Sequence, residues 1–478
     1  MPPNVRSLPP VGVFLLLFPL GLFKAIVAQT NLYAMQLRKP NKKCGLPLTV
    51  HEFSVWIGLH MKMMKNWGGR QDLFFSSRAG FDARDYMSRR RFYWIKFHLH
   101  FADRTKRPKR NDPAWDPLYL LRPLITTANF TFRRYWRLST YVSLDEMMLS
   151  FRGSNPFHRY IPRKPHPNGF KLHAICDAKM YFCVAFLVDD NISRTVETIA
   201  CELFRNNVVP GMTVITDRFY TCSGLVRFCV ATGVGLIGST KTRNFMAKHV
   251  LTGWTGNEAK KRLRGEFEVA TNHGGQVACI VWKDKGIVRF TCTSSASCRV
   301  TVRRRLKHEA PLLVNAPLCA KVYDSYFHGV DRNDQLRGCG YGLALTFRAR
   351  KYTVKFFLGF LDVLLSNTWI LWRSLHPKDI KEHAAWFNRL TDDFMTFNPL
   401  KDPVYRSEKE KRSEGSHQQA PLAYGRDHRR KQADCPICTT SHKRKRTTMG
   451  CATCNVGLCS LKCFLQWHDK TPQKRSIW

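Results

Sequence analysis

Apolar residues recur at helical spacing through most of the first part of the chain. The segment Thr49–Met64 carries its apolar residues on one helical face, and Thr49 is a residue type that caps helix N-termini. Asp85–Asp103 is basic in its first turns and aromatic further on, and Leu20–Met35 and Leu118–Trp136 repeat the helical spacing. The pattern predicts an all-helical region over about the first 135 residues.

A short apolar run near the N-terminus, Val11–Phe23, follows Arg6 and is similar to the core of a signal peptide. It is too short to span a bilayer, and no clear small-residue cleavage site lies at the expected distance. We therefore do not expect secretion.

The pattern changes at Leu138 to short stretches rich in β-branched and aromatic residues. The predicted strands are Thr140–Met148, Gly169–Asp177, Tyr181–Asp189, Thr213–Asp217 and Val234–Gly238. Helical spacing occurs between them at Thr195–Phe204 and Ser223–Thr232. Strands and helices in this order predict an α/β domain.

The second half is less regular. Phe245–Ala320 mixes short strands with basic runs and is predicted to be an insertion. Phe356–Trp372 is a long apolar helix that we expect to pack on the sheet, because its polar residues Asp362, Ser366 and Asn367 disfavour a membrane span. The polar segment Asp402–Gln432 is predicted to be a linker.

Charge and cysteine content narrow the function. The 77 Lys and Arg against 35 Asp and Glu give a net charge of +42, which predicts a polyanionic partner, most simply nucleic acid. A membrane surface is the alternative, but no strongly basic amphipathic helix dominates the sequence. Most cysteines outside the C-terminal region are scattered, which is typical of a reducing compartment.

Four aspartates are candidates for metal-dependent chemistry. Asp145 and Asp217 are each predicted to end a strand, and acids at the carboxyl ends of neighbouring strands converge on one edge of a sheet. Asp331 and Asp334 lie three residues apart on a helix predicted to begin after Gly329. Three such carboxylates could hold two Mg²⁺ ions roughly 3.5–4 Å apart for in-line phosphoryl transfer.

Each of these aspartates also has a simpler explanation. Asp is common at helix N-termini and in turns because its side chain caps backbone N–H groups. Asp177, Asp189 and Asp190 also end predicted strands, and we interpret those three as caps. Position alone does not choose between these explanations.

Longer motifs decide the interpretation. From about Ile26 to His468 the chain resembles piggyBac-type transposases and proteins derived from them, with the matching segments in the same order. The matching segments are MSRRRF at 87–92, HLHFAD at 98–103, LDEMMLSFRG at 144–153, YIPRKP at 160–165 with GFK at 169–171, TDRFYT at 216–221 and GVDRNDQ at 329–335.

The resemblance implies a multidomain α/β fold around an RNase H-like core of the DDE/D type. Asp145, Asp217 and Asp331 would be the catalytic triad binding Mg²⁺ or Mn²⁺, with Asp334 as a helper. The implied domains are a tail (1–25), a helical dimerisation and DNA-binding region (26–137), two core parts (138–240 and 323–375), an insertion (241–322), C-terminal DNA-binding helices with a charged linker (376–432) and a zinc finger (433–470).

The implied activity is cut-and-paste transposition of double-stranded DNA at TTAA sites by a homodimer in the nucleus. The expected DNA-binding residues are Arg152, Lys164, Lys171, Arg348, Arg350, Lys351, Lys443, Arg444, Lys445 and Arg446. The basic run at 443–446 also fits a nuclear localisation signal. The alternative functions are a domesticated, catalytically silent DNA-binding protein and a nuclease that cuts without joining.

Six of the 17 cysteines fall within the last 44 residues. Together with two histidines they supply eight zinc ligands, enough for two closed structural sites: Cys435, Cys438, His442, Cys451, Cys454, Cys459, Cys463 and His468. The family resemblance implies a cross-braced finger. In it Cys435 and Cys438 share one ion with Cys459 and Cys463, and Cys451, Cys454 and His468 hold the second ion with one more ligand, for which His442 is the candidate.

Overall fold

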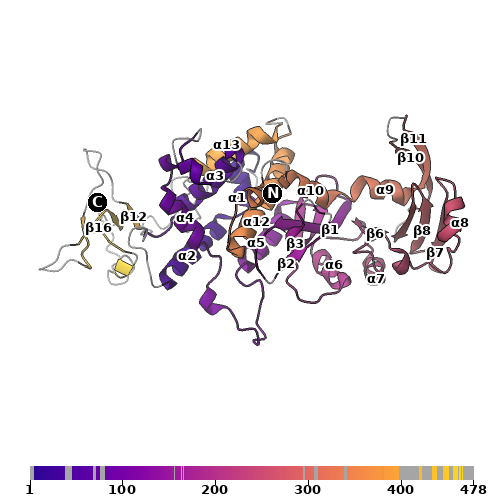
Figure 1. The fold of residues 1–478 in the computed structure, drawn as a ribbon, viewed down its shortest axis with the longest axis horizontal. Coiled ribbons are helices and arrows are strands. Elements are labelled where there is room, and N and C mark those ends of the chain that lie inside the picture. Colours follow the sequence, from indigo (N-terminus) through magenta and orange to yellow (C-terminus); the bar gives the residue numbers. More distant parts are fainter. Residues whose placement is uncertain are drawn as a thin grey trace. The chain divides into compact units, whose positions relative to one another are not determined.

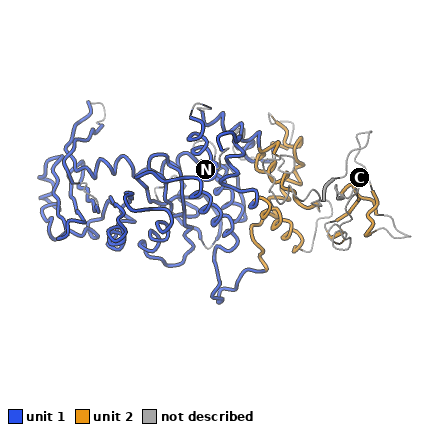
Figure 2. The backbone as a smooth tube through the Cα atoms, turned by 180° about the vertical axis from the view of Figure 1, so that it is seen from behind, with its two compact units in different colours: residues 1–22, 60–73, 106–393 blue, residues 23–59, 74–105, 394–478 orange. Residues whose placement is uncertain are grey.

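The computed structural model describes most of the chain, in two compact units. The described residues are 5–37, 46–67, 71–75, 81–155, 157–162, 164, 166–293, 297–305, 310–338, 342–377, 379, 382–397, 419–421, 433–438, 445–451, 456–460, 462–463 and 466. Unit 1 comprises residues 1–22, 60–73 and 106–393, and unit 2 comprises residues 23–59, 74–105 and 394–478 (Figure 2).

A nine-stranded mixed sheet forms the centre of unit 1, with the path β2-β3-β1-β5-β6-β9-β8-β7 and β4 paired to β3. Its strands are β1 (Tyr141–Ser150), β2 (His158–Tyr160), β3 (Asn168–Asp177), β4 (Cys183–Val188), β5 (Thr213–Thr216), β6 (Gly235–Ser239), β7 (Phe267–Thr271), β8 (Ala278–Lys283) and β9 (Ile287–Cys292). The pairs β1–β5 and β5–β6 are parallel, and the other pairs are antiparallel. The predicted insertion therefore contributes three strands that continue the core sheet beyond β6.

Two apolar layers cover the sheet. Neighbouring residues of β5 point to opposite faces, so that Val214 packs with α6 (Val196–Phe204) and α7 (Ser223–Thr232). Ile215 packs on the other face with α9 (Leu318–Tyr326) and with a two-stranded ribbon, β10 (Arg299–Arg304) and β11 (Leu312–Pro317). Figure 1 shows this ribbon beside β8, with α8 (Gly256–Lys261) at the end of the same part of the sheet.

Helices cover the part of the sheet around β1. The helices α10 (Gly329–Gly338), α11 (Leu343–Thr346) and α12 (Tyr352–Leu375) pack on β1, α5 (Arg122–Tyr135) packs on β4, and α1 (Pro10–Leu17) packs on α12 and α5. The apolar N-terminal segment belongs to this core, because the Phe18 ring lies 6.4 Å from Phe357 and 6.1 Å from Phe360. The helix α13 (His383–Thr396) follows α12 along the chain.

Buried polar residues of α12 bond to neighbouring backbone. The Asp362 carboxylate accepts hydrogen bonds from the backbone N–H groups of Leu343 (2.7 Å) and Ala344 (2.9 Å), which caps α11. Asn367 both accepts from Cys183 N (2.9 Å) and donates to Cys183 O (2.7 Å). By length and composition α12 could cross a membrane, as could α1 and the following helix if taken as one span, but the apolar stretch of α12 is completely buried in the protein.

Unit 2 is helical in its N-terminal part. The helices α2 (Leu20–Gln36) and α3 (Val50–Trp67) begin or end in it, and α4 (Arg89–His98) lies within it. The N-terminus of α3 is a capping box in which Glu52 N donates to Thr49 Oγ1 and Thr49 N donates to Glu52 Oε2, both at 3.1 Å. The predicted helix at 85–103 is shorter than expected, because Ser88 caps α4 and only Arg89–His98 is α-helical.

The remaining elements are short. Single-turn 3₁₀ helices are η1 (Val5–Ser7), η2 (Gln71–Phe75), η3 (Ala83–Asp85), η4 (Arg104–Lys106) and η5 (Thr242–Asn244). Short strands near the C-terminus are β12 (Gln419–Pro421), β13 (Ala433–Asp434), β14 (Arg446–Thr447), β15 (Met449–Cys451) and β16 (Val456–Gly457). The predicted linker at 402–432 lies outside the described residues except for β12.

Candidate functional site

Two of the predicted aspartates lie side by side on parallel strands. The last residues paired between β1 and β5 are Leu144 and Thr216. Asp145 and Asp217 are the residues that directly follow this pair in the sequence. The expectation that Asp145 ends its strand was wrong, because β1 continues to Ser150 through its antiparallel pairing with β3. Asp145 instead lies where the parallel neighbour β5 stops, which has the same effect on the position of its carboxylate.

A third carboxylate, Glu146, joins these two. One side-chain oxygen from each of Asp145, Glu146 and Asp217 lies within 4.8 Å of the others. Glu146 was not among the predicted site residues, although two consecutive acids within an apolar strand were a visible signal. Its Oε2 atom is buried, and no group in the described part of the chain hydrogen-bonds to it. A cluster of oxygen donors with one unsatisfied buried oxygen fits a hard divalent cation.

The helix α10 brings Asp331 to the same part of the sheet. Gly329 lies against β1 so closely that an added Cβ would come within 2.7 Å of the Ser143 Cβ, and Ser143 Oγ donates to Phe327 O at 2.9 Å. The Asp331 carboxylate is not within the group of three at 4.8 Å. It contacts the Lys164 ammonium at 3.3 Å instead.

Asp334 is not among the three clustered acids. Its carboxylate forms an ion pair with Arg337 one turn further along α10, and Arg337 also donates to Met148 O of β1 at 3.0 Å. Burial, which outweighs the neighbouring guanidinium, raises the pKa of Asp334. These contacts attach α10 to β1.

Burial and the repulsion between neighbouring carboxylates raise pKa values in the acid cluster. Burial, and then the neighbouring Glu146 carboxylate, raise the pKa of Asp145 well above its usual value. Burial also raises the pKa of Asp217, against hydrogen bonds from the backbone N–H groups of Phe219 and Tyr220. Although burial opposes it, the carboxylates of Asp145 and Asp331 raise the pKa of Lys164 and keep it cationic. The cluster therefore favours the binding of further positive charge.

Two of the predicted DNA-binding lysines lie at the cluster. Lys164 also donates to Glu146 O at 3.2 Å, and Lys171 Nζ lies 4.3 Å from the centre of the Phe219 ring. Beside them His173 Nδ1 lies 2.6 Å from the Tyr220 hydroxyl, and burial lowers the pKa of His173 to about 4. Two lysines and an uncharged His–Tyr pair thus lie beside the acid cluster, along what we call its border.

The other predicted DNA-binding residues lie elsewhere. Arg152, Arg348 and Arg350 are exposed, and Lys351 is half-buried. Lys445 and Arg446 are exposed, whereas Lys443 and Arg444 lie outside the described residues.

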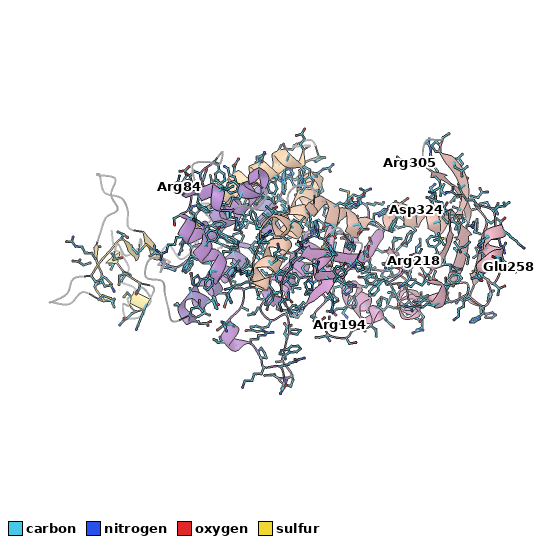
Figure 3. The ribbon with its side chains drawn as sticks, in the orientation of Figure 1. Arg84, Arg194, Arg218, Glu258, Arg305 and Asp324 are labelled. Carbon is cyan, nitrogen blue, oxygen red and sulfur yellow. The ribbon has the colours of Figure 1, made fainter. Side chains whose placement is uncertain are left out.

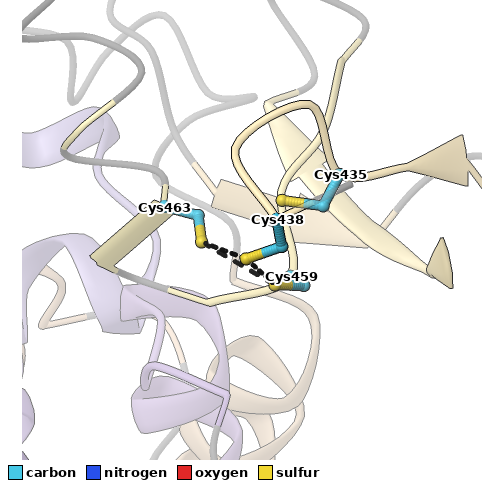
Figure 4. A group of neighbouring side chains, drawn as sticks. All are labelled: Cys435, Cys438, Cys459 and Cys463. Atoms are coloured by element: carbon cyan, nitrogen blue, oxygen red, sulfur yellow. Dashed lines mark hydrogen bonds between the residues drawn. The ribbon is translucent and has the colours of Figure 1, made fainter. Parts of the chain in front are cut away.

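Four cysteines form a second candidate metal site (Figure 4). The Sγ atoms of Cys435, Cys438, Cys459 and Cys463 all lie within 4.8 Å of one another. The Sγ atom of Cys438 is 3.3 Å from that of Cys463 and 3.6 Å from that of Cys459. Four thiols at this separation fit one tetrahedral Zn²⁺ with bonds of about 2.3 Å. The side chains of the other predicted ligands, His442, Cys451, Cys454 and His468, lie outside the described residues.

Comparisons with known proteins agree with one another. A model of the family Transposase IS4 matches residues 9–369. The human PiggyBac transposable element-derived protein 2 is 24% identical over 489 residues, which cover 97% of this chain and 77% of the relative. The human PiggyBac transposable element-derived protein 3 is also 24% identical, over 94% of this chain and 74% of the relative. A cryo-EM structure of a piggyBac transposase synaptic complex with hairpin DNA matches with a TM-score of 0.70 at 17% identity, over 96% of both chains.

Proposed function

Since the chain belongs to the Transposase IS4 family and is of the piggyBac type, we propose that it cuts and joins DNA strands at its cluster of buried carboxylates. The observation that carries the proposal is the meeting of Asp145, Glu146 and Asp217 within 4.8 Å at the end of the parallel strand pair. Adjacent carboxylates with raised pKa values are typical of phosphoryl-transfer sites.

Asp145, Asp217 and Asp331 would hold Mg²⁺ or Mn²⁺, with Glu146 as a further ligand. When bound, such ions activate the attacking water or 3′-hydroxyl and stabilise the leaving oxygen. Asp334 would act as a positioning residue, because its contact with Arg337 holds α10 against β1.

The lysines at the border would bind the DNA backbone. Lys164 can exchange its contact with Asp331 for a phosphate oxygen when a divalent ion takes the carboxylate. Burial raises the pKa of Asp217 and the Lys171 ammonium nearby partly opposes that rise, so this ammonium is placed to hold a phosphate beside the acids. The surface arginines Arg152, Arg348 and Arg350 would extend the DNA contact away from the cluster.

Several finer features come from the family likeness. We propose that the preferred target is TTAA, that the active form is a homodimer and that the protein works in the nucleus. The matched synaptic complex contains hairpin DNA, which supports DNA ends as the substrate. We further propose that the four clustered thiols bind Zn²⁺ as a structural site and that the remaining predicted ligands form a second one.

A second candidate function is DNA binding without catalysis. Its support is that the two human relatives are named as transposable element-derived proteins. Both candidates predict DNA binding, and only the first predicts cleavage.

The test is cleavage by the purified protein of linear DNA duplexes that carry candidate terminal repeats next to TTAA. We expect nicking that requires Mg²⁺ or Mn²⁺ and depends on TTAA. Tight binding of the same duplexes without nicking, in both metals, would leave the silent DNA-binding protein as the function.

A further inference from the structure

The ribbon β10–β11 is firmly attached to the sheet by one of its faces. Val302, Val314 and Ala316 are buried in one apolar cluster with Ile280 and other residues of the sheet. The Trp282 indole N–H donates to Asn315 O at 2.9 Å, which links β8 directly to β11. These contacts hold the inner face of the ribbon on the sheet, so the outer face points away from the sheet.

That outer face is basic and exposed. Arg299, Thr301 and Arg303 alternate along β10 and are all exposed, while the residues between them point inward. In the antiparallel register, Thr301 is opposite Asn315 and Arg303 is opposite Leu313, and both partners are exposed. Leu313 itself is 68% exposed, so none of the described residues covers this position of the face.

The arginines of the two faces differ in their partners. Arg304, on the inner face, pairs with Asp284 at 3.1 Å and Asp324 at 2.5 Å. Within the described residues, no acidic side chain pairs with Arg303 or with Arg305 at the end of the ribbon, and neither strand contains an acid. Arg299 lies over the Phe267 ring at 5.6 Å, and no acid among the described residues forms an ion pair with it. Figure 3 labels Arg305 at the end of the ribbon and Asp324 on α9.

The dimensions of this face fit a DNA duplex. Four residues along a strand separate Arg299 and Arg303 by about 13 Å, close to the width of about 12 Å of the major groove, which admits a two-stranded ribbon. Guanidinium groups bind phosphate oxygens in a bidentate manner, and Thr and Asn side chains also contact phosphates.

We propose that the outer face of the β10–β11 ribbon (Arg299, Thr301, Arg303, Leu313 and Asn315) docks on double-stranded DNA, with the two arginines on phosphates. The ribbon is a second DNA contact, separate from the acid cluster. The inference rests on the proposed function only for its choice of partner.

The experiment measures binding of the full-length protein to a 30-base-pair duplex by fluorescence anisotropy at several salt concentrations. The variant R299Q/R303Q should weaken binding several-fold and reduce the slope of log K against log salt by about 1.8, since each phosphate contact contributes about 0.9. The control R205Q/R227Q removes the same charge from exposed positions on α6–α7, across the sheet from the ribbon, and should leave the slope unchanged.

A second pair of variants tests the face without removing an arginine. Leu313→Glu places a carboxylate opposite Arg303 and should weaken binding several-fold, whereas Leu313→Gln should change it less than twofold. Wild-type binding that R299Q/R303Q and Leu313→Glu both leave unchanged would overturn the ribbon contact but not the proposed function. Tight binding of anionic lipid vesicles that the same variants abolish, with DNA binding unchanged, would assign the face to a membrane instead. A wild-type protein that binds no DNA would overturn both proposals.

Discussion

Lys164 Nζ lies 3.3 Å from Asp331 Oδ1, although 167 residues separate the two along the chain. The contact joins the loop before β3 to the helix α10 beside the acid cluster. It places a protein cation on a carboxylate that a divalent ion would need, and the nearby acids raise the pKa of Lys164 so that it remains charged.

Lys164→Met should therefore tighten divalent-ion binding in the absence of DNA. Removal of the competing ammonium frees Asp331, and we expect Mn²⁺ affinity to rise by roughly tenfold, or about 1.4 kcal/mol. Titration calorimetry with Mn²⁺ measures this change. Lys285→Met, at an exposed turn between β8 and β9, is the matched control. Equal Mn²⁺ affinity in both variants would show that Lys164 does not compete with the ion.

Gly329→Ala should displace α10 from β1. The new methyl group would meet the Ser143 Cβ at 2.7 Å and the Ala178 Cα at 3.2 Å, and such overpacking costs about 1–3 kcal/mol. We expect that loss of stability in denaturant unfolding, together with slower DNA cleavage. Gly338→Ala at the other end of α10 has open space around its Cβ and should lose neither. Normal cleavage by Gly329→Ala would mean that the seating of α10 does not position Asp331.

Stability should fall in mild acid because of His383. Its ring lies 5.0 Å from Trp369 and 5.7 Å from Trp386, and burial lowers its pKa to about 4. The folded state therefore favours the neutral ring. The stabilisation is complete above the unfolded pKa of about 6.5 and is lost as the pH falls towards 4, by about 3 kcal/mol in total.

His383→Phe should remove the part of this dependence that His383 contributes and leave the part from His173, whose pKa burial also lowers to about 4. Unfolding free energies measured between pH 7 and pH 4 provide the comparison. The variant of an exposed histidine, His166→Gln, should keep the wild-type slope. An identical loss of stability in the wild type and His383→Phe would assign the acid sensitivity to other groups.

Zinc content should separate the two predicted finger sites. Cys435→Ser removes one of the four clustered thiols and should lower the zinc content of the full-length protein by one ion per chain, measured by mass spectrometry. Cys298→Ser, at an exposed cysteine outside the cluster, should change nothing. Two ions in the wild type would support the eight-ligand prediction with His442, and one ion would limit zinc to the four thiols. A wild-type protein without zinc would contradict both sites.

Local patterns predicted much of the core. Helix α7 was predicted with its observed bounds, and β5 was recognised as a buried strand that leads to Asp217. The start of α10 at Gly329 was also predicted, because glycine followed by a polar helical pattern is a local signal. These features depend on residues close in sequence, so a local sequence pattern is enough to predict them.

Non-local pairing accounts for what was missed. The antiparallel contact between β6 and β9, which joins the insertion to the core sheet, has no signature in either segment. Asp145 was expected to end a strand, whereas pairing with β3 continues β1 to Ser150. Strand alternation assigns Glu146 to the face opposite Asp145, and only the folded cluster shows its carboxylate beside the other two.

Cleavage by Asp217→Asn tests the central claim most directly. The variant keeps the shape of the side chain but removes its charge from the cluster of Asp145, Glu146 and Asp217. The assay would follow Mg²⁺-dependent nicking of a linear duplex at TTAA, with anisotropy as the measure of DNA binding and Asp189→Asn, in the ion pair with Arg159 outside the cluster, as the control. We predict that Asp217→Asn binds DNA as the wild type does but nicks it more than about a hundredfold more slowly, while Asp189→Asn nicks normally. Undiminished nicking by Asp217→Asn would contradict the assignment of catalysis to these carboxylates.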